Sequence, residues 1–411
     1  MKQQSARPYW LLTMVLCGMA ASSIGVGINC VGIFYTPVSD SLGILRGSFA
    51  IHATLSQGAI SVMALLLPRL MARFHYKALL LVGVILAVFA TGAMSFSSQL
   101  WEFYLLGILR GLGVGLFSTV PITMILTNWF HKSHGLATSI TLSFSGLAGA
   151  VCSPLLTWCI TQFGWRHAYL IMAAAMAILV VPALLSPITT GPQEKGLPPY
   201  GGTLEQVKPK TVSQKRPPFS YRTFCFLAMC ALTLLHTSIA GIAQHFTGFS
   251  ESIGQTAETG AFMMSLAMVG NICTKLVIGV LSDRFGPVKA SVSMILLNAV
   301  SLGLLLLASA WSSLPLLLTA AFLYGSVYSV GAVGLSLLSR LFFGAENYSS
   351  AYSVIGLLVT MGSAISQPLI GYLYDFTGSY LPMLFVALGI HVVDLILLAG
   401  AKKTYRKEYH S

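Results

Sequence analysis

The chain is built from apolar runs long enough to cross a membrane. A helix needs about 20 apolar residues to span the hydrocarbon core of a bilayer, and such runs recur along the whole sequence. We therefore expect an all-α polytopic membrane protein with twelve transmembrane helices. The expected spans are 9–34, 48–68, 78–97, 100–128, 135–161, 167–187, 221–247, 257–281, 287–309, 312–340, 348–373 and 380–401.

Composition gives the same result. Hydrophobic residues make up 55% of the chain and charged residues only 8%. A soluble domain needs roughly a quarter charged residues to cover its surface, so this surface must contact membrane lipids. The net charge of +12 does not indicate nucleic acid, because the basic residues lie in short gaps between apolar runs. The seven cysteines fall within apolar runs without CxxC or Cys/His metal spacing, so we expect neither metal nor cofactor.

One long polar stretch divides the chain. Residues 188–220 are rich in proline and contain Lys208, Lys210, Lys215 and Arg216, a composition typical of a flexible linker. The expected organisation is a six-helix bundle at 1–187, a cytoplasmic linker at 188–220 and a second six-helix bundle at 221–411. Only Arg46 and Arg166 fall in outer loops when both termini and the linker are placed in the cytoplasm, which follows the positive-inside rule.

The two halves repeat short features. Pro154 is followed ten residues later by Gly164, and Pro368 is followed ten residues later by Gly378. The spacing of leucine, arginine and phenylalanine also repeats in two loops, as Leu70, Arg73 and Phe74 and as Leu281, Arg284 and Phe285. Two pseudo-symmetric six-helix halves with a solute site between them are a plan of secondary transporters.

These motifs resemble a known family. Gly279-Val280-Leu281-Ser282-Asp283-Arg284-Phe285-Gly286 is similar to the short inner-loop motif of the major facilitator superfamily. In the copy after the second helix, Pro68 and Ala72 replace the expected Gly and Asp. The run Arg110 to Gly115 resembles the arginine- and glycine-rich fourth helix of that superfamily. The resemblance implies the fold of that superfamily over the whole chain.

A narrower resemblance is to the monocarboxylate carriers and the oxalate:formate antiporters. It rests on Trp129 to Ala137, on Gly164-Trp165-Arg166 and on Lys275 four residues before Gly279. Asn347-Tyr348 to Tyr352 and Gly371-Tyr372 also look related. There are departures: only Tyr9-Trp10 stands where many monocarboxylate carriers have an acidic-glycine-tryptophan motif. Lys275 replaces a more usual arginine, and Ile355 stands where oxalate carriers have a lysine.

Lys275 is the first candidate for binding a solute anion. A charge within a span is costly and usually faces a cavity or a partner. Asn271 lies one helical turn away on the same face and can help to orient a carboxylate. The alternative is that Lys275 extends toward the cytoplasm, since Asp283 is two turns on. Further candidate contacts, in helices expected to line the path or to pack ordinarily, are Asn29, Tyr35, Tyr324 and Tyr328.

A second group of residues is a candidate for coupling or gating. The resemblance suggests that Arg110 acts in gating, while the alternative is a structural role in helix packing. Asp283 and Arg284 are expected to form a conformational latch, or else a solvated charge pair. His236 and His245 are able to titrate near neutral pH or to serve as hydrogen-bonded helix contacts. Asp394 is the carboxylate that lies clearly within a span, although helix 12 usually lies at the periphery in this superfamily.

The sequence therefore predicts a secondary transporter, functional as a monomer, in the plasma or inner cell membrane. Its expected substrate is a small organic anion, a monocarboxylate similar to lactate or pyruvate, moved by alternating access, with protons as a candidate coupling ion. An enzyme is not expected, because there is no Walker loop, hydrolase elbow or metal spacing. The alternatives are an exporter of hydrophobic or cationic compounds, and a membrane signalling or scaffold protein.

Overall fold

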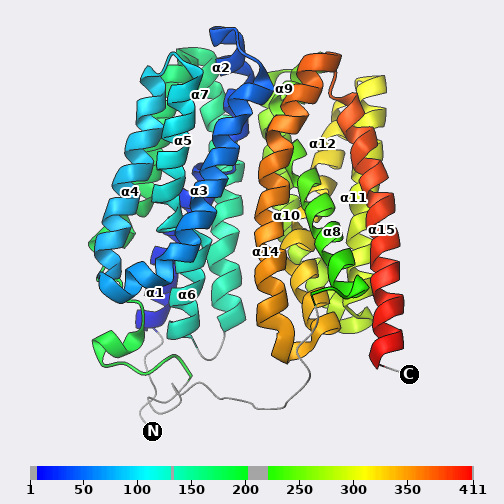
Figure 1. Cartoon of the computed structure of the whole chain (residues 1–411). Coiled ribbons are helices and arrows are strands. Elements are labelled where there is room, and N and C mark those ends of the chain that lie inside the picture. The colour runs from blue at the N-terminus through cyan, green and yellow to red at the C-terminus, as the bar shows by residue number, and fades with distance from the viewer. Residues whose placement is uncertain (1–6, 131–133, 202–220, 410–411) are drawn as a thin grey trace. The chain divides into compact units, whose positions relative to one another are not determined.

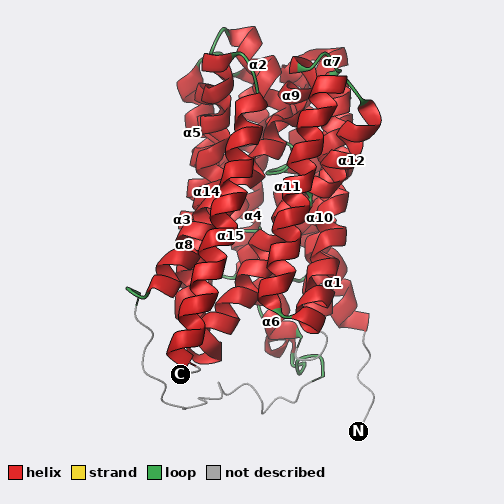
Figure 2. Ribbon diagram, turned by 90° about the vertical axis from the view of Figure 1, so that its right-hand side faces the viewer, coloured by secondary structure: helices red, strands yellow, loops and turns green. Residues whose placement is uncertain are grey.

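A computed structural model describes residues 7–130, 134–201 and 221–409, which are helical apart from short turns and one isolated bridge between Phe130 and Tyr200 (Figures 1 and 2). The chain divides into two compact units. One comprises residues 1–43 and 55–212, and the other comprises residues 44–54 and 213–411. The expected boundaries at 187 and 221 remain a prediction.

The first part of the chain, through residue 185, forms seven helical segments. They are α1 (Arg7–Ala20), α2 (Tyr35–Leu42), α3 (Arg46–Arg73), α4 (Tyr76–Ala93), α5 (Leu100–Gly115), α6 (Thr119–Trp129) and α7 (His134–Leu185). Local caps define several helix starts. The Glu102 carboxylate, for example, accepts hydrogen bonds from the backbone N–H groups of Ser98 and Gln99 at the start of α5, where otherwise unpaired donors gather.

The part from residue 224 onward forms eight helical segments. They are α8 (Phe224–Ile239), α9 (Phe246–Ser252), α10 (Ala257–Phe285), α11 (Pro287–Trp311), α12 (Leu314–Tyr324), α13 (Ser326–Ser329), α14 (Leu335–Thr377) and α15 (Leu381–Tyr409). Thr223 and Thr256 begin α8 and α10 by accepting hydrogen bonds from the N–H groups of Phe226 and Thr259.

The number of spans agrees with twelve. Eleven helical stretches of the described residues are long and apolar enough to cross a membrane. One of them, Ile140–Leu185, has 46 residues and would extend for about 70 Å as a single helix, more than twice the hydrocarbon thickness. Gly164 breaks it with a non-helical backbone (φ 80°, ψ 160°), so this stretch supplies two spans.

Each unit begins and ends on one side. The Tyr9 hydroxyl donates to the Pro198 carbonyl at 2.7 Å, which brings the first span of the first unit next to the segment that follows its last span. In the second unit, Gly400 of α15 lies close to Phe224 at the start of α8, since a Cβ placed on this glycine would be 3.1 Å from the Phe224 ring. An even number of spans in each unit is required for these ends to meet.

Four spans are interrupted at corresponding positions of the two halves. The first span changes from α1 through a π-helical segment (η1, Ala21–Val26) and a 3₁₀ segment (η2, Val31–Phe34) to α2, and the seventh changes through η6 (Ala240–His245). The fourth breaks between α5 and α6, and the tenth breaks around Gly325 and η7 (Val330–Gly334). Interrupted spans in matching places of two repeats are typical of solute sites in transporters.

The outer faces of the helices are apolar. Ile178 is 70% exposed and Phe385 is 62% exposed, although both are large hydrophobic side chains. Exposed hydrophobic side chains occur along most of the long helices, while many serines and threonines, four histidines and Asp394 are buried. The four histidines are His52, His236, His245 and His391. This inside-out distribution is expected for helices that contact lipid.

The repeated glycines end helices in both halves. Gly164 terminates the fifth span, and Gly378 caps α14 in the left-handed conformation (φ 67°, ψ 10°). Gly286, the last residue of the inner-loop motif, separates α10 from α11 with φ 88° and ψ 156°. The angles of Gly164 and Gly286 are accessible almost only to glycine, and the left-handed conformation of Gly378 favours glycine, which explains why glycine recurs there.

Gly164→Ala should therefore lower the free energy of unfolding by about 1–3 kcal/mol, because it strains the backbone. A Cβ at this position would have no heavy atom within 4 Å, so steric clash does not contribute. The measurement is the thermal unfolding of the purified variant in detergent. Gly303→Ala, at an equally open position inside α11, is the control and should unfold no earlier than the parent protein. Equal unfolding temperatures for the two variants would contradict this account.

Candidate functional site

Lys275 and Asn271 lie on α10 of the second unit, where this helix packs against an interrupted span. A side chain at Gly270 or Gly325 would overlap the backbone of Phe322 or of Asn271, so α10 approaches the junction of α12 and α13 backbone to backbone. Thr274 fixes this approach, because its hydroxyl lies 3.3 Å from the Gly325 carbonyl. Lys275 and Asn271 therefore stand beside the break in the tenth span.

Lys275 has no hydrogen-bond or ion-pair partner among the described residues. Its side chain is half-buried, and the Asn271 Oδ1 atom is buried without a hydrogen-bond partner in the part of the chain described. The space beside Gly279, one turn further on, is open. Asp283 is exposed and forms no ion pair with Lys275. A cation and an amide thus lie one helical turn apart on α10, beside the break in the tenth span.

Tyr324 and Tyr328 use their hydroxyls to satisfy the backbone of the seventh span. The Tyr324 hydroxyl donates to the Ile239 carbonyl, and the Tyr328 hydroxyl lies 3.5 Å from the Ala240 carbonyl. These carbonyls lie where α8 gives way to η6, at a helix end that leaves acceptors unpaired. In this structure both hydroxyls are engaged within the bundle.

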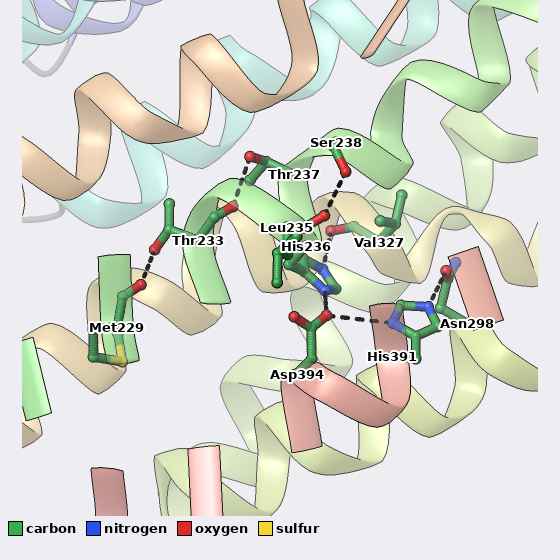
Figure 3. Close-up of polar contacts among 10 residues, drawn as sticks. All are labelled: Met229, Thr233, Leu235, His236, Thr237, Ser238, Asn298, Val327, His391 and Asp394. Atoms are coloured by element: carbon green, nitrogen blue, oxygen red, sulfur yellow. Dashed lines mark hydrogen bonds and ion pairs between the residues drawn. The ribbon is translucent and has the colours of Figure 1, made fainter. Parts of the chain in front are cut away.

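The two candidate histidines of the seventh span have different surroundings. His245 donates through Nε2 to the Gln367 carbonyl at 2.8 Å and packs against the ring of Tyr380. His236 belongs to a buried polar cluster with Asp394 and His391 of α15 and Asn298 of α11 (Figure 3). His236 Nδ1 lies 3.1 Å from Asp394 Oδ2, and His391 Nδ1 lies 3.5 Å from the same oxygen.

This cluster is closed to solvent. His236, Asp394 and Asn298 are 0% exposed and His391 is 2% exposed. The far nitrogens are also held, since His236 Nε2 lies 3.2 Å from the Val327 carbonyl and His391 Nε2 lies 2.8 Å from Asn298 Oδ1. Asp394 is therefore buried within the second unit, and α15 contributes to its polar interior instead of only covering its periphery.

The cluster also combines side chains that are able to bind a metal ion. Among the described residues, His236, His391 and Asp394 form one group whose possible ligand atoms lie within 4.8 Å of one another. The two Nδ1–Oδ2 distances are close to the roughly 3.4 Å expected between ligands of a small tetrahedral ion. A divalent ion would leave the cluster with a net charge of +1 in a fully buried site, which is costly.

In the first unit, Arg110 of α5 is a buried cation with no carboxylate partner among the residues that the structure describes. It is 1% exposed, and its Nε and Nη1 atoms have no hydrogen-bond partner among the described residues. Tyr35, at the start of α2, and Tyr169 of α7 are close enough to interact electrostatically with it. Phe34 stacks on Tyr169 with ring centroids 3.9 Å apart, which holds this tyrosine beside the arginine.

Asn29 lies near this group in sequence but packs elsewhere on α7. It follows the π-helical segment η1, and a Cβ on Gly149 would lie 3.2 Å from the Asn29 Cβ. Asn29 thus marks the close approach of the interrupted first span to α7.

Asp283 and Arg284 end α10 at the inner-loop motif. Both side chains are exposed, and Arg284 lies over the ring of Phe285 at 5.3 Å. Part of the motif that begins at Trp129 lies outside the described residues, because 131–133 are not described. A latch through Asp283 remains a prediction.

The Gly164-Trp165-Arg166 motif has a structural role within the first unit. Arg166 donates through Nη1 to the carbonyls of Ser95 and Ser97 at 2.7 and 2.9 Å, where the third span ends. Its guanidinium also lies over the Trp165 ring at 4.3 Å. The motif therefore ties the start of the sixth span to the end of the third.

The structure adds two members that sequence reasoning did not propose as site residues. His391 and Asn298 complete the cluster around His236 and Asp394. A signal was present, because His391 and Asp394 are three residues apart and so share a helix face.

An apolar pocket lies in another part of the second unit. It is lined by residues of α8, α14 and α15 and of the η6 segment, among them Ile242, Ile370 and Met383. It contains none of the predicted site residues.

Twelve spans with paired interruptions in the two halves are typical of membrane transporters. The profile of the Major Facilitator Superfamily matches residues 12–257 and 238–408, and the chain belongs to this superfamily. The chain is 28% identical to monocarboxylate transporter 13 of Rattus norvegicus over 332 residues, covering 79% of this chain and 72% of that protein. It is 26% identical to monocarboxylate transporter 12 of Homo sapiens, covering 80% and 67%.

Solved structures support the fold. A nucleoside transporter, NupG, matches with a TM-score of 0.73 at 14% identity and covers 95% of this chain and 99% of that one. A bacterial homologue of the lysosomal transporter Spinster matches with a TM-score of 0.65 at 13% identity and covers 98% and 97%. The expected fold class and the resemblance to the monocarboxylate carrier family are confirmed.

Proposed function

We propose that this protein is a secondary transporter of a small organic anion, a monocarboxylate of the size of lactate or pyruvate or somewhat larger. It alternates between outward-open and inward-open states in the plasma or inner cell membrane. The relatives named as monocarboxylate transporters, at 26–28% identity, support the substrate class. A solute or ion gradient drives transport, and protons are the candidate coupling ion.

The observation that carries the proposal is the unpaired ammonium group of Lys275. A charge inside a span is tolerated when a partner or a cavity receives it, and no described side chain pairs with Lys275. An incoming carboxylate would supply this partner, and Asn271 is placed one turn away to orient it. The mobile solute thus completes an electrostatic pair that the second unit leaves open.

The apolar surroundings of Ile355 favour a monoanion over a dianion. By its resemblance, Ile355 stands where oxalate carriers have a second cation, and here it is 0% exposed within an apolar cluster that includes Met229 and Leu338. A dianion would keep one charge without a partner in the second unit, which is costly in a poorly hydrated site. Arg110 is the other cation to test, as a gating or coupling residue.

Replacing Lys275 should separate a binding role from a packing role. Lys275→Ala should reduce uptake of lactate or pyruvate into proteoliposomes to background, while Lys275→Arg should retain part of it because the charge remains. Lys289→Ala removes an exposed lysine at the start of α11 and is the matched control, expected to transport normally.

Transport by the variants and direct binding to the purified protein can each contradict the proposal. Undiminished monocarboxylate transport by Lys275→Ala would remove this residue from the site. Tight oxalate binding without a response to monocarboxylates would contradict the charge argument, and uptake of organic cations alone would favour an exporter of such compounds.

The orientation can be tested by cysteine labelling from outside intact cells. Single cysteines introduced within 1–8, 188–220 and 402–411 should all be protected, because the positive-inside rule places these segments in the cytoplasm. A cysteine at Trp101, which is 59% exposed near the start of α5, is the control for an outer position and should be labelled. Labelling of any of the three segments would overturn this orientation.

The latch predicts a kinetic effect. Asp283→Asn should slow solute exchange several-fold more than it weakens solute binding, because a latch acts on the conformational equilibrium. Glu258→Gln, an exposed carboxylate at the other end of α10, is the control. Normal turnover of Asp283→Asn would leave Asp283 as a solvated surface charge.

A further inference from the structure

The hydrogen bonds at the edge of the His236–Asp394–His391 cluster fix the tautomers of both histidines. The Val327 carbonyl can only accept, so His236 must donate to it through Nε2. Asn298 Nδ2 donates to the Tyr324 carbonyl at 3.0 Å, which orients the amide so that its Oδ1 accepts from His391 Nε2. Each neutral ring is therefore left with an acceptor at Nδ1.

Three acceptors then meet in one buried place. Both Nδ1 atoms are directed at Asp394 Oδ2, at 3.1 and 3.5 Å (Figure 3). An ionised carboxylate cannot donate, so two neutral rings would oppose it with lone pairs and a net charge of −1. The cluster is closed to bulk solvent, because its members are at most 2% exposed. Such an arrangement requires a positive charge in its centre.

We propose that the cluster is a binding site for one proton in addition to the two Nε2 protons. A single added proton makes the group neutral as a whole, whereas two would leave it at +1. The distances agree with one proton: the 3.1 Å contact of His236 is a hydrogen bond, and the 3.5 Å contact of His391 is longer. The same balance favours a proton over a divalent metal ion.

Among the described residues, the ion-pair contacts of the cluster are those between its own members. His391 and Asp394 interact electrostatically with each other and with His236. Along the helices, Lys289 of α11 and Lys402 of α15 are about 12–14 Å from Asn298 and Asp394. Among the residues whose side chains are described, the other titratable groups of the packed elements α8, α10, η6, α12, α13, α14 and α15 are Cys225, Cys230, His245, Glu258, Cys273, Lys275, Asp283, Arg284, Tyr324, Tyr328, Arg340, Tyr348, Tyr352, Tyr372, Tyr374, Asp375, Lys403 and Tyr405.

The proton is placed to act on both interrupted spans of the second unit. His236 lies three residues before the end of α8 and holds Val327 of α13, and Asn298 holds the last carbonyl of α12. The α12–α13 junction is in turn packed against Asn271 of α10. Loss of the proton would set the lone pairs of His236 and Asp394 against each other and loosen these contacts. In the transporter proposed above, this connects proton binding to the solute site.

The proton can be tested without a solute by ¹⁵N NMR of labelled histidines in the full-length protein in lipid nanodiscs. We expect the His236 ring to carry protons on both nitrogens at low pH and to lose its Nδ1 proton in one step as the pH rises. His391 should remain neutral with its proton on Nε2. Signals are assigned from the spectra of His236→Gln and His391→Gln, and His75→Gln, at an exposed loop position, is the control that should leave the cluster signals unchanged.

Asp394→Asn gives the sharpest contrast. An asparagine amide is able to donate where the carboxylate accepts, so the variant satisfies the cluster without an added proton. We expect His236 to stay neutral at every pH. If this variant does not fold, His391→Gln should retain the His236 titration, because the His236–Asp394 pair remains.

Three results would overturn the proposal. They are two neutral rings at every pH in the parent protein, an unchanged His236 titration in Asp394→Asn, and one equivalent of a transition metal that is present in the parent protein but absent from Asp394→Asn. These measurements use no solute, so their failure leaves the monocarboxylate proposal standing. A confirmed titration in a protein that binds no carboxylate would instead refute the proposed substrate.

Discussion

The hydrogen-bonding requirement of the backbone in lipid governs this structure. Helices meet it internally, so every interruption of a span releases carbonyl and N–H groups that need other partners. In the second unit these partners are side chains: Tyr324 and Tyr328 satisfy the end of α8, Asn298 satisfies the last carbonyl of α12, and His236 satisfies α13. The buried polar residues thus supply the hydrogen-bond partners that the interrupted helices need.

The spans themselves could be predicted from the sequence because their cause is local. Length and hydropathy are enough to locate a helix that crosses a bilayer, and glycine at 164, 286 and 378 marks chain reversals that need positive φ. The fusion of the fifth and sixth spans into α7 shows the same point, since Gly164 alone separates them. The assignment of helix ends was less accurate, because α2 and α9 extend the first and seventh spans beyond the apolar runs.

The candidate site was less predictable because its partners are distant in sequence. His236 and Asp394 are 158 residues apart, and His391 and Asn298 are 93 apart, so no local pattern joins them. The sequence also does not show whether a tyrosine hydroxyl binds a solute or the protein backbone. Tyr324 and Tyr328 are candidate solute contacts in the sequence, and in the structure their hydroxyls contact the backbone of the seventh span. Glycines in the first, fourth, seventh and tenth spans were the available signal for interruption.

The charges inside the second unit fall into two separate arrangements, and their separation has a mechanistic consequence. Asp394 is the buried carboxylate of the described residues, and its Oδ2 is committed to two histidines, so it does not neutralise Lys275. If Asp394 paired with Lys275, an entering anion would have to displace a carboxylate already bound. Because the histidines hold Asp394 instead, the ammonium group remains available to a solute. The two arrangements are connected through the backbone of α12 and α13, so in the transporter we propose any coupling of proton and anion must act through the shape of this junction rather than through direct charge exchange.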